Sequence, residues 1–128
     1  MVSRVTRSFN TINPATGEKL STYDFDSLEK AKTTVEQSHN VFKEQWSRLS
    51  VTQRADYFRS LAKVLRDGRT AYASTMTSEM GKPITQSLSE VDKVAWSAEV
   101  FADKASEWLA EEKVETDAKR SFVSFEPQ

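Results

Sequence analysis

The chain has 128 residues, of which 18 are basic and 19 acidic, so its formal charge at neutral pH is −1. It contains no cysteine, which excludes disulfides, thiolate metal ligands and a thiol nucleophile from this chain. The balanced charge gives no reason to expect nucleic acid or an anionic membrane as a partner, and no apolar run approaches the ~20 residues of a membrane span. No signal-peptide pattern opens the chain, so we expect a cytoplasmic location.

The N-terminal region predicts a hairpin of two short strands. Asn13-Pro14-Ala15-Thr16-Gly17 is a turn signal, because asparagine, proline and glycine each favour turn conformations. β-prone residues stand on both sides of this turn. We therefore expect strands over residues 9–12 and about 19–25.

Two helices are expected next. Asp26 and Glu29 have the spacing of a capping box, which predicts that the first helix begins at Asp26. Its apolar row, at helical spacing, consists of Leu28, Ala31, Val35, Phe42, Trp46 and Leu49. A second capping box, Ser50-Val51-Thr52-Gln53, begins the next helix, and Asp67-Gly68 ends it. The predicted buried face of that helix is Ala55, Phe58, Leu61, Ala62 and Leu65.

A third helix is expected from about Arg69 to Met80, because Gly81 suits a left-handed C-terminal position and Pro83 prevents continuation. Pro83 is also favourable as the first residue of a fourth helix. The apolar row of this helix advances by steps of four and three: Ile84, Leu88, Val91, Ala95, Ala98, Ala102, Ala105 and Leu109. Val94, Phe101 and Trp108 widen the row, which favours burial in a globular core over a coiled-coil seam.

The C-terminal region predicts a loop followed by a strand. Residues 111–119 are polar and are expected to loop outward, whereas residues 120–125 have strand character. We expect this strand to be an unpaired, adhesive edge.

Residues that could carry chemistry are sparse. His39, the single histidine, lies at the edge of the first apolar row without a fixed acid or nucleophile, so we interpret it as structural. Glu99 and Asp103 are four residues apart beside Lys104, which is typical of a solvated helix face. The tryptophans stand on helices and are interpreted as packing residues. No glycine-rich loop is available to bind a phosphate.

Several short motifs follow one another in a definite order. They are Ile12-Asn13-Pro14-Ala15-Thr16-Gly17-Glu18, Arg54 with Leu61-Ala62, Glu79-Met80-Gly81-Lys82-Pro83, and Glu90 with Ala95-Trp96. This ordered set resembles the N-terminal segment of the aldehyde dehydrogenase superfamily, and residues 80–84 with Glu90-Val91 are most similar to the succinate-semialdehyde dehydrogenase branch. Residues 122–127 are similar to the strand that leads into the cofactor-binding core of that family.

The resemblance implies an α/β parent fold, of which this chain would be a mainly α-helical segment: four helices, an N-terminal two-strand hairpin and a C-terminal strand. Residues 1–118 would form part of the cofactor-binding domain, and residues 119–128 would begin the oligomerisation strand, with the catalytic domain absent. The complete enzyme would use NAD or NADP. Its catalytic and cofactor-binding residues would lie outside this chain, so none is assigned here and the chain alone is expected to bind neither dinucleotide.

The resemblance also implies two minor sites, at the positions of this sequence that match the family. The backbone carbonyls of Ile12 and Glu79 would help to hold a monovalent cation; alternatively, they are satisfied within a strand and a helix end. Glu90 and Val94 would face the aldehyde entry tunnel of the family. For Val94, burial in the core is the alternative.

Three functional hypotheses follow. The leading one is the N-terminal portion of an NAD(P)-dependent aldehyde dehydrogenase, acting on succinate semialdehyde and non-catalytic alone. It would be a truncated chain, a disrupted gene product or one chain of a split enzyme, with the remainder of a homo-oligomeric enzyme as its partner. The second is a self-contained helical module for oligomerisation or interaction. The third is association with longer relatives through residues 120–125.

Overall fold

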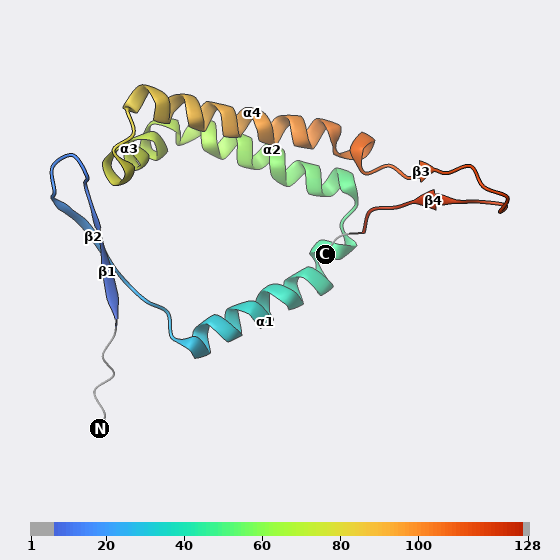
Figure 1. Ribbon diagram of the computed structural model, residues 1–128, viewed down its shortest axis with the longest axis horizontal. Coiled ribbons are helices and arrows are strands. Elements are labelled where there is room, and N and C mark those ends of the chain that lie inside the picture. The colour runs from blue at the N-terminus through green and yellow to red at the C-terminus, as the bar shows by residue number, and fades with distance from the viewer. Residues whose placement is uncertain (1–6, 127–128) are drawn as a thin grey trace.

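The computed structural model describes residues 7–126, which form a hairpin, a helical body and a projecting arm (Figure 1). In chain order the elements are β1 (Ser8–Ile12), β2 (Lys19–Asp24), α1 (Leu28–Glu44), the 3₁₀ turn η1 (Trp46–Arg48), α2 (Val51–Asp67), α3 (Arg69–Met80), α4 (Ile84–Trp108), β3 (Glu112–Lys113) and β4 (Phe122–Val123). This order confirms the predicted four helices and N-terminal hairpin. None of the helices in this part of the chain combines the length and apolarity needed to cross a membrane.

The N-terminal hairpin pairs β1 with β2 in an antiparallel register. Phe9 lies opposite Tyr23, and their rings stack with centroids 5.5 Å apart. Gly17 has a φ of +75°, a left-handed conformation that glycine adopts without a steric penalty. The predicted turn is therefore confirmed.

Helix α1 differs from the prediction in how it begins and ends. Its N-cap is Ser27, whose side chain accepts a hydrogen bond from the Lys30 amide at 3.1 Å. Asp26 instead pairs with the Lys30 ammonium at 2.6 Å, so the predicted box with Glu29 is wrong. The helix ends at Glu44, because the chain tightens into η1 before reaching residue 49.

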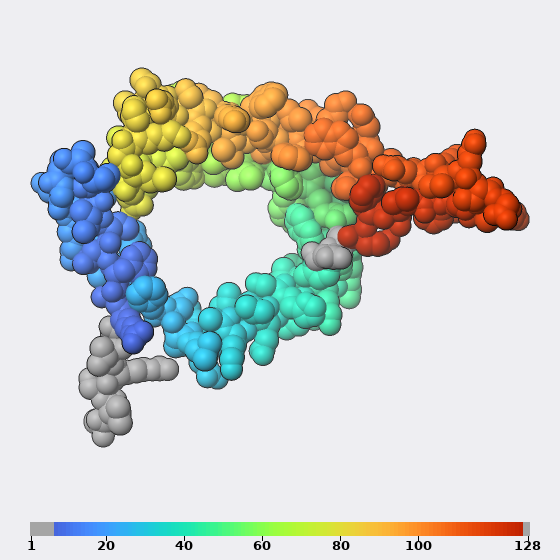
Figure 2. Space-filling view, in the orientation of Figure 1, coloured from blue at the N-terminus to red at the C-terminus, as the bar shows by residue number. Residues whose placement is uncertain are grey.

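The apolar row of α1 is also not buried as predicted. Leu28 is 73% exposed and Val35 is 69% exposed, and no residue of the helix is buried. Figure 1 shows that α1 lies apart from α2 and α4, which agrees with this exposure. Figure 2 shows the hairpin, α1 and the helical body around an opening.

The helical body packs α2 against α4 through small residues. Ala62, Ala95 and Ala98 form its buried cluster, with Leu65 packed against them. The capping box that begins α2 is confirmed, with Ser50 Oγ accepting from the Gln53 amide at 3.2 Å. Alanine lets two helix backbones approach closely, so this row defines the packing of the two helices.

Larger residues beside the alanine row are more exposed than predicted. Phe58 is 38% exposed and Leu61 is 45% exposed. The residues expected to widen the α4 row are also open: Val94 is 46% exposed, Phe101 54% and Trp108 48%. The broad stripe extends past the edge of the α2–α4 contact, and no other described element covers it.

The C-terminal region forms an arm that projects from the helical body (Figure 1). The predicted strand over residues 120–125 is reduced to β4, and it is paired rather than free. Its partner is β3, in the segment expected to be a loop, with Lys113 opposite Phe122. Arg120 stabilises the arm by pairing with Glu111 at 2.7 Å and by lying over the Phe122 ring.

Candidate functional site

The turn of the N-terminal hairpin lies against the junction of α3 and α4. Gly81 follows α3 with a φ of +70°, so it forms the predicted left-handed cap. A Cβ placed on Gly81 would lie 3.0 Å from Cγ of Pro14. Segments more than sixty residues apart in the sequence thus meet at a position where only a small residue fits.

This meeting point brings together the two segments predicted to offer carbonyl oxygens to a cation. Ile12 is the last residue of β1, and Glu79 lies in the last turn of α3. The carbonyl of Glu79 has no helical partner four residues on, because Pro83 has no amide hydrogen. Residues 7–126 contain no cluster of three His, Asp or Glu side chains that could hold a metal.

A hydrogen-bonded pair of hydroxyl groups lies at this junction. Ser87, in the second turn of α4, is fully buried, and its Oγ lies 3.1 Å from Oγ1 of Thr77 in α3. Each hydroxyl can donate or accept, so the half-buried Thr77 satisfies the hydroxyl of the buried Ser87. The pair joins α3 to the start of α4.

Glu90 and Val94 lie side by side on α4, at the border of two open hollows. One hollow has a volume of about 350 Å³, lies over α3, and is lined by Tyr72, Met76 and Val91 among others. The other, of about 570 Å³, is lined by polar residues of α4 and by Lys82. The predicted alternative of a buried Val94 is wrong, because this side chain faces both hollows.

The second hollow carries a small excess of positive charge. Lys82 forms an ion pair with Glu90 across its rim, and Lys93 adds a further cation to its lining. Pairing with Lys82 offsets the charge of the Glu90 carboxylate. The remaining positive charge favours an anionic group in this hollow over a cationic one.

His39, Glu99 and Asp103 lie on exposed or half-exposed helix faces. His39 is exposed on α1. Glu99 forms an ion pair with Arg66 of α2, and Asp103 forms one with Arg59 of the same helix. Both carboxylates are partly exposed. These ion pairs link α2 to α4 beside the alanine row.

The described residues, 7–126, show no turn of the kind that binds a dinucleotide in the Rossmann fold. Binding of a pyrophosphate at a helix N-terminus requires a glycine-rich turn that leads from a parallel strand into the helix. Within residues 7–126 the strand pairs are both antiparallel, and the helices begin at Ser27, Ser50, Gly68 and Pro83 without such a turn.

Two residues of interest were present in the sequence motifs without an assigned role. Lys82 is the partner of Glu90, and its place just before Pro83 and the fourth helix was the available signal. Arg54 interrupts an apolar helix face, three residues after Val51 and four before Phe58. A charge at that spacing indicates a group held within an apolar surface.

Comparison with known proteins gives one consistent result. The family model described as "Aldehyde dehydrogenase family" matches residues 1–128. A Synechocystis protein described as a "probable succinate-semialdehyde dehydrogenase" with NADP⁺ is 38% identical over 117 residues, covering 91% of this chain and 26% of that protein. A succinate semialdehyde dehydrogenase from Escherichia coli K12, described with NAD(P)⁺, is 29% identical and is covered to 25%.

Solved structures agree. Succinic semialdehyde dehydrogenase from Streptococcus pyogenes, crystallised with NADP⁺, superposes with a TM-score of 0.84 at 33% identity, over 91% of this chain and 26% of that one. Betaine aldehyde dehydrogenase from Staphylococcus aureus, crystallised with NAD⁺, has a TM-score of 0.84 at 22% identity, which shows a shared fold. The chain spans about a quarter of the length of the relatives it matches.

Proposed function

Because this chain belongs to the aldehyde dehydrogenase family, we propose that it is the N-terminal part of an NAD(P)-dependent enzyme that oxidises succinate semialdehyde to a dicarboxylate. The observation that carries the proposal is the 38% identity to the Synechocystis protein over 117 residues. The catalytic groups and the dinucleotide site belong to the part of the enzyme that this chain does not span. The chain itself supplies support to the cofactor-binding domain through residues 1–118.

The uncovered apolar surface supports this role. The row on α1 and the outer residues of the α4 stripe are exposed, although such surfaces are ordinarily buried in a folded domain. The opening bordered by the hairpin, α1 and the helical body (Figure 2) provides room for further chain. We infer that the remainder of the enzyme covers these faces.

The proposed substrate agrees with the charge around Glu90 and Val94. In the complete enzyme these two residues face the aldehyde entry tunnel. Lys82 and Lys93 supply a positive lining beside them, which would attract a substrate that carries a carboxylate. A neutral aldehyde would gain nothing from that charge.

We also propose that the carbonyls of Ile12 and Glu79 contribute to a monovalent-cation site. The contact between Pro14 and Gly81 supports it by bringing their segments together. Carbonyl oxygens replace the hydration shell of such cations in proteins. The complete enzyme is then expected to unfold at a higher temperature in potassium or sodium chloride than in choline chloride of equal ionic strength. Equal midpoints in all three salts would exclude the site.

The arm belongs to the same proposal. Residues 119–128 would begin the strand that joins an oligomerisation sheet, and the described part of the outer strand, β4, has one free edge for a further strand. Val123→Lys places a charge on that edge. It is expected to reduce co-purification with longer relatives, whereas unchanged co-purification would contradict the role.

A chimera tests the central proposal. This chain would replace the corresponding segment of the Synechocystis protein, and NADP⁺-dependent oxidation of succinate semialdehyde would be measured. We expect kcat/KM within about tenfold of that of the parent, a difference of about 1.4 kcal/mol in transition-state stabilisation. A folded chimera that binds NADP⁺ but has no turnover would contradict the proposal.

The isolated chain is the matched control, and it also tests the alternative of a self-contained helical module. Titration with NAD⁺ and NADP⁺ is expected to show no specific binding, because the phosphate-binding turn is missing. A single monodisperse species that melts cooperatively would favour the module, since its apolar faces would then be covered by a second copy.

A further inference from the structure

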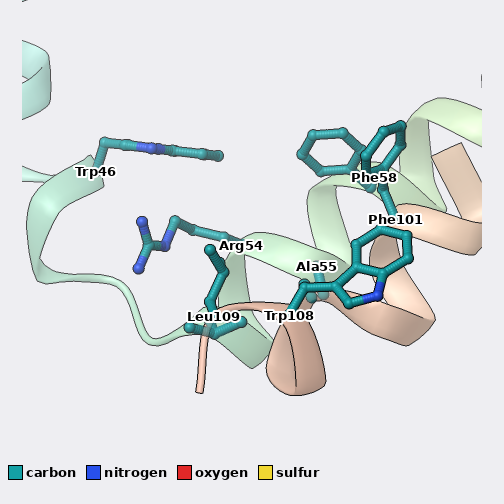
Figure 3. Close-up of a pocket in the computed structure, with 9 residues that line it drawn as sticks. Trp46, Arg54, Ala55, Phe58, Phe101, Trp108 and Leu109 are labelled. Carbon is teal, nitrogen blue, oxygen red and sulfur yellow. The ribbon is translucent and has the colours of Figure 1, made fainter. Parts of the chain in front are cut away.

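An apolar groove of about 310 Å³ lies between the start of α2 and the end of α4. Its walls are mainly aromatic: Phe58 and Phe101 have ring centroids 6.4 Å apart, and Phe101 meets Trp108 edge-on at 5.7 Å. Trp46 closes one side and Leu109 the other, with the Arg54 side chain between them (Figure 3).

Arg54 is the charged residue of this groove, and it has no partner among residues 7–126. Its Nε is buried and makes no hydrogen bond there. None of the ion pairs formed by these residues includes Arg54. A buried donor of a charged group without a partner is unfavourable, so the groove as it stands is incomplete.

The other arginines of the helical body show what Arg54 lacks. Arg59, Arg66 and Arg69 each pair with a carboxylate of α4. A guanidinium group binds a carboxylate best, through two parallel hydrogen bonds. The complement of this groove is therefore a carboxylate flanked by apolar side chains.

We propose that this groove docks a segment of the enzyme beyond this chain, and that an aspartate or glutamate of that segment pairs with Arg54. The inference rests on the proposed function, because the relatives are covered to only about a quarter of their length. The remaining three quarters can supply both the carboxylate and the apolar flanks. A small soluble acid would leave the aromatic walls uncovered. The cross-linking experiment below distinguishes a segment of the same enzyme from a second copy of this chain.

Carbodiimide coupling in the chimera identifies the partner directly. Arg54→Lys keeps the positive charge and provides an amine, which a carbodiimide joins to a carboxylate in contact with it. Mass spectrometry is expected to find residue 54 linked to an aspartate or glutamate in the part of the chimera supplied by the Synechocystis protein. Arg48→Lys is the matched control, because Arg48 is exposed outside the groove and is expected to give no such link. The pair Lys104–Glu107, at 2.8 Å, reports that coupling has worked.

A link only to residues of a second copy, or no link at residue 54 in an active chimera, would overturn the inference while leaving the proposed function intact. An inactive chimera would contradict the proposed function instead.

A second measurement does not depend on the lysine variant. Val51→Cys introduces a thiol on the groove wall. In the chimera its alkylation, followed by peptide mass, is expected to be at least about tenfold slower than that of Arg48→Cys, which lies exposed outside the groove. Equal rates would show that nothing docks there.

Discussion

Arg69, the first residue of α3, holds Asp92 of α4 with two hydrogen bonds, Nε to Oδ1 at 2.6 Å and Nη2 to Oδ2 at 2.7 Å. This bidentate pair continues a series of arginine–carboxylate pairs along α4, in which Arg66 binds Glu99 and Arg59 contacts Asp103. The series fixes the register of the helices that position the junction of α3 and α4. Hydrogen bonding from Arg69 lowers the pKa of Asp92 below its ordinary value of 3.8.

Replacing Asp92 is expected to destabilise the chain in a pH-dependent way. Because the folded-state pKa of this carboxyl is depressed, its contribution is complete above pH 3.8 and is lost as the pH falls towards the folded-state value. Asp92→Asn in the chimera should therefore lower the urea midpoint at neutral pH, and the difference from the unsubstituted chimera should narrow in acid. Asp117→Asn, in the exposed arm, is the control and should leave the urea midpoint unchanged both at neutral pH and in acid. A constant difference at every pH would mean that the pair does not titrate with folding.

Substitutions at the start of α1 distinguish the two candidate caps. Ser27→Ala removes the side chain that accepts from the Lys30 amide, so it is expected to cost about 1 kcal/mol of helix stability. Asp26→Ala removes only an exposed ion pair and should cost less. Circular dichroism during urea unfolding measures both. A larger loss for Asp26→Ala would restore the cap that the sequence alone predicts.

Local features were predictable because the residues that decide them are neighbours in the sequence. The Ser50 capping box, the left-handed Gly81 and the alanine row of α4 each depend on a few residues at fixed spacing, and all are present. The choice between Asp26 and Ser27 was not predictable in this way, because both are good caps and stand next to each other.

Features that depend on distant chain were not predictable. The apolar row of α1 has the spacing of a buried face, but no described element packs on Val35 or its neighbours. β4 pairs with β3, which is only two residues long and polar. The residues of β3 therefore did not predict a strand. The lack of a partner for Arg54 was likewise invisible, since spacing shows where a side chain stands on a helix and not what lies opposite it.

Two glycines with nearly the same positive φ allow the cost of a left-handed backbone to be distinguished from the cost of a steric contact. Gly81 and Gly17 have φ values of +70° and +75°, so an alanine at either position has a left-handed penalty of about 1–2 kcal/mol. A Cβ at Gly81 would also lie 3.0 Å from Pro14 Cγ, whereas one at Gly17 would meet nothing within 4 Å. Gly81→Ala should therefore lower stability more than Gly17→Ala in urea unfolding. Equal losses would mean that the hairpin turn does not rest on the α3–α4 junction.

Substitutions on α4 test whether small residues define the packing of α2 against α4. Ala95 is fully buried and belongs to the same cluster as Ala62, so a larger side chain has no space without moving the helices apart. Ala95→Leu is expected to cost about 1–3 kcal/mol of unfolding free energy, since overpacking outweighs the added apolar burial. Lys93→Leu adds a leucine to the same helix at an exposed position and should stay within about 0.5 kcal/mol. If both variants unfold at the same urea concentration, the helices are not in contact along the alanine row. In that case only the arginine–carboxylate pairs would join the two helices. Exposed ion pairs of this kind are too weak to hold a helical body together.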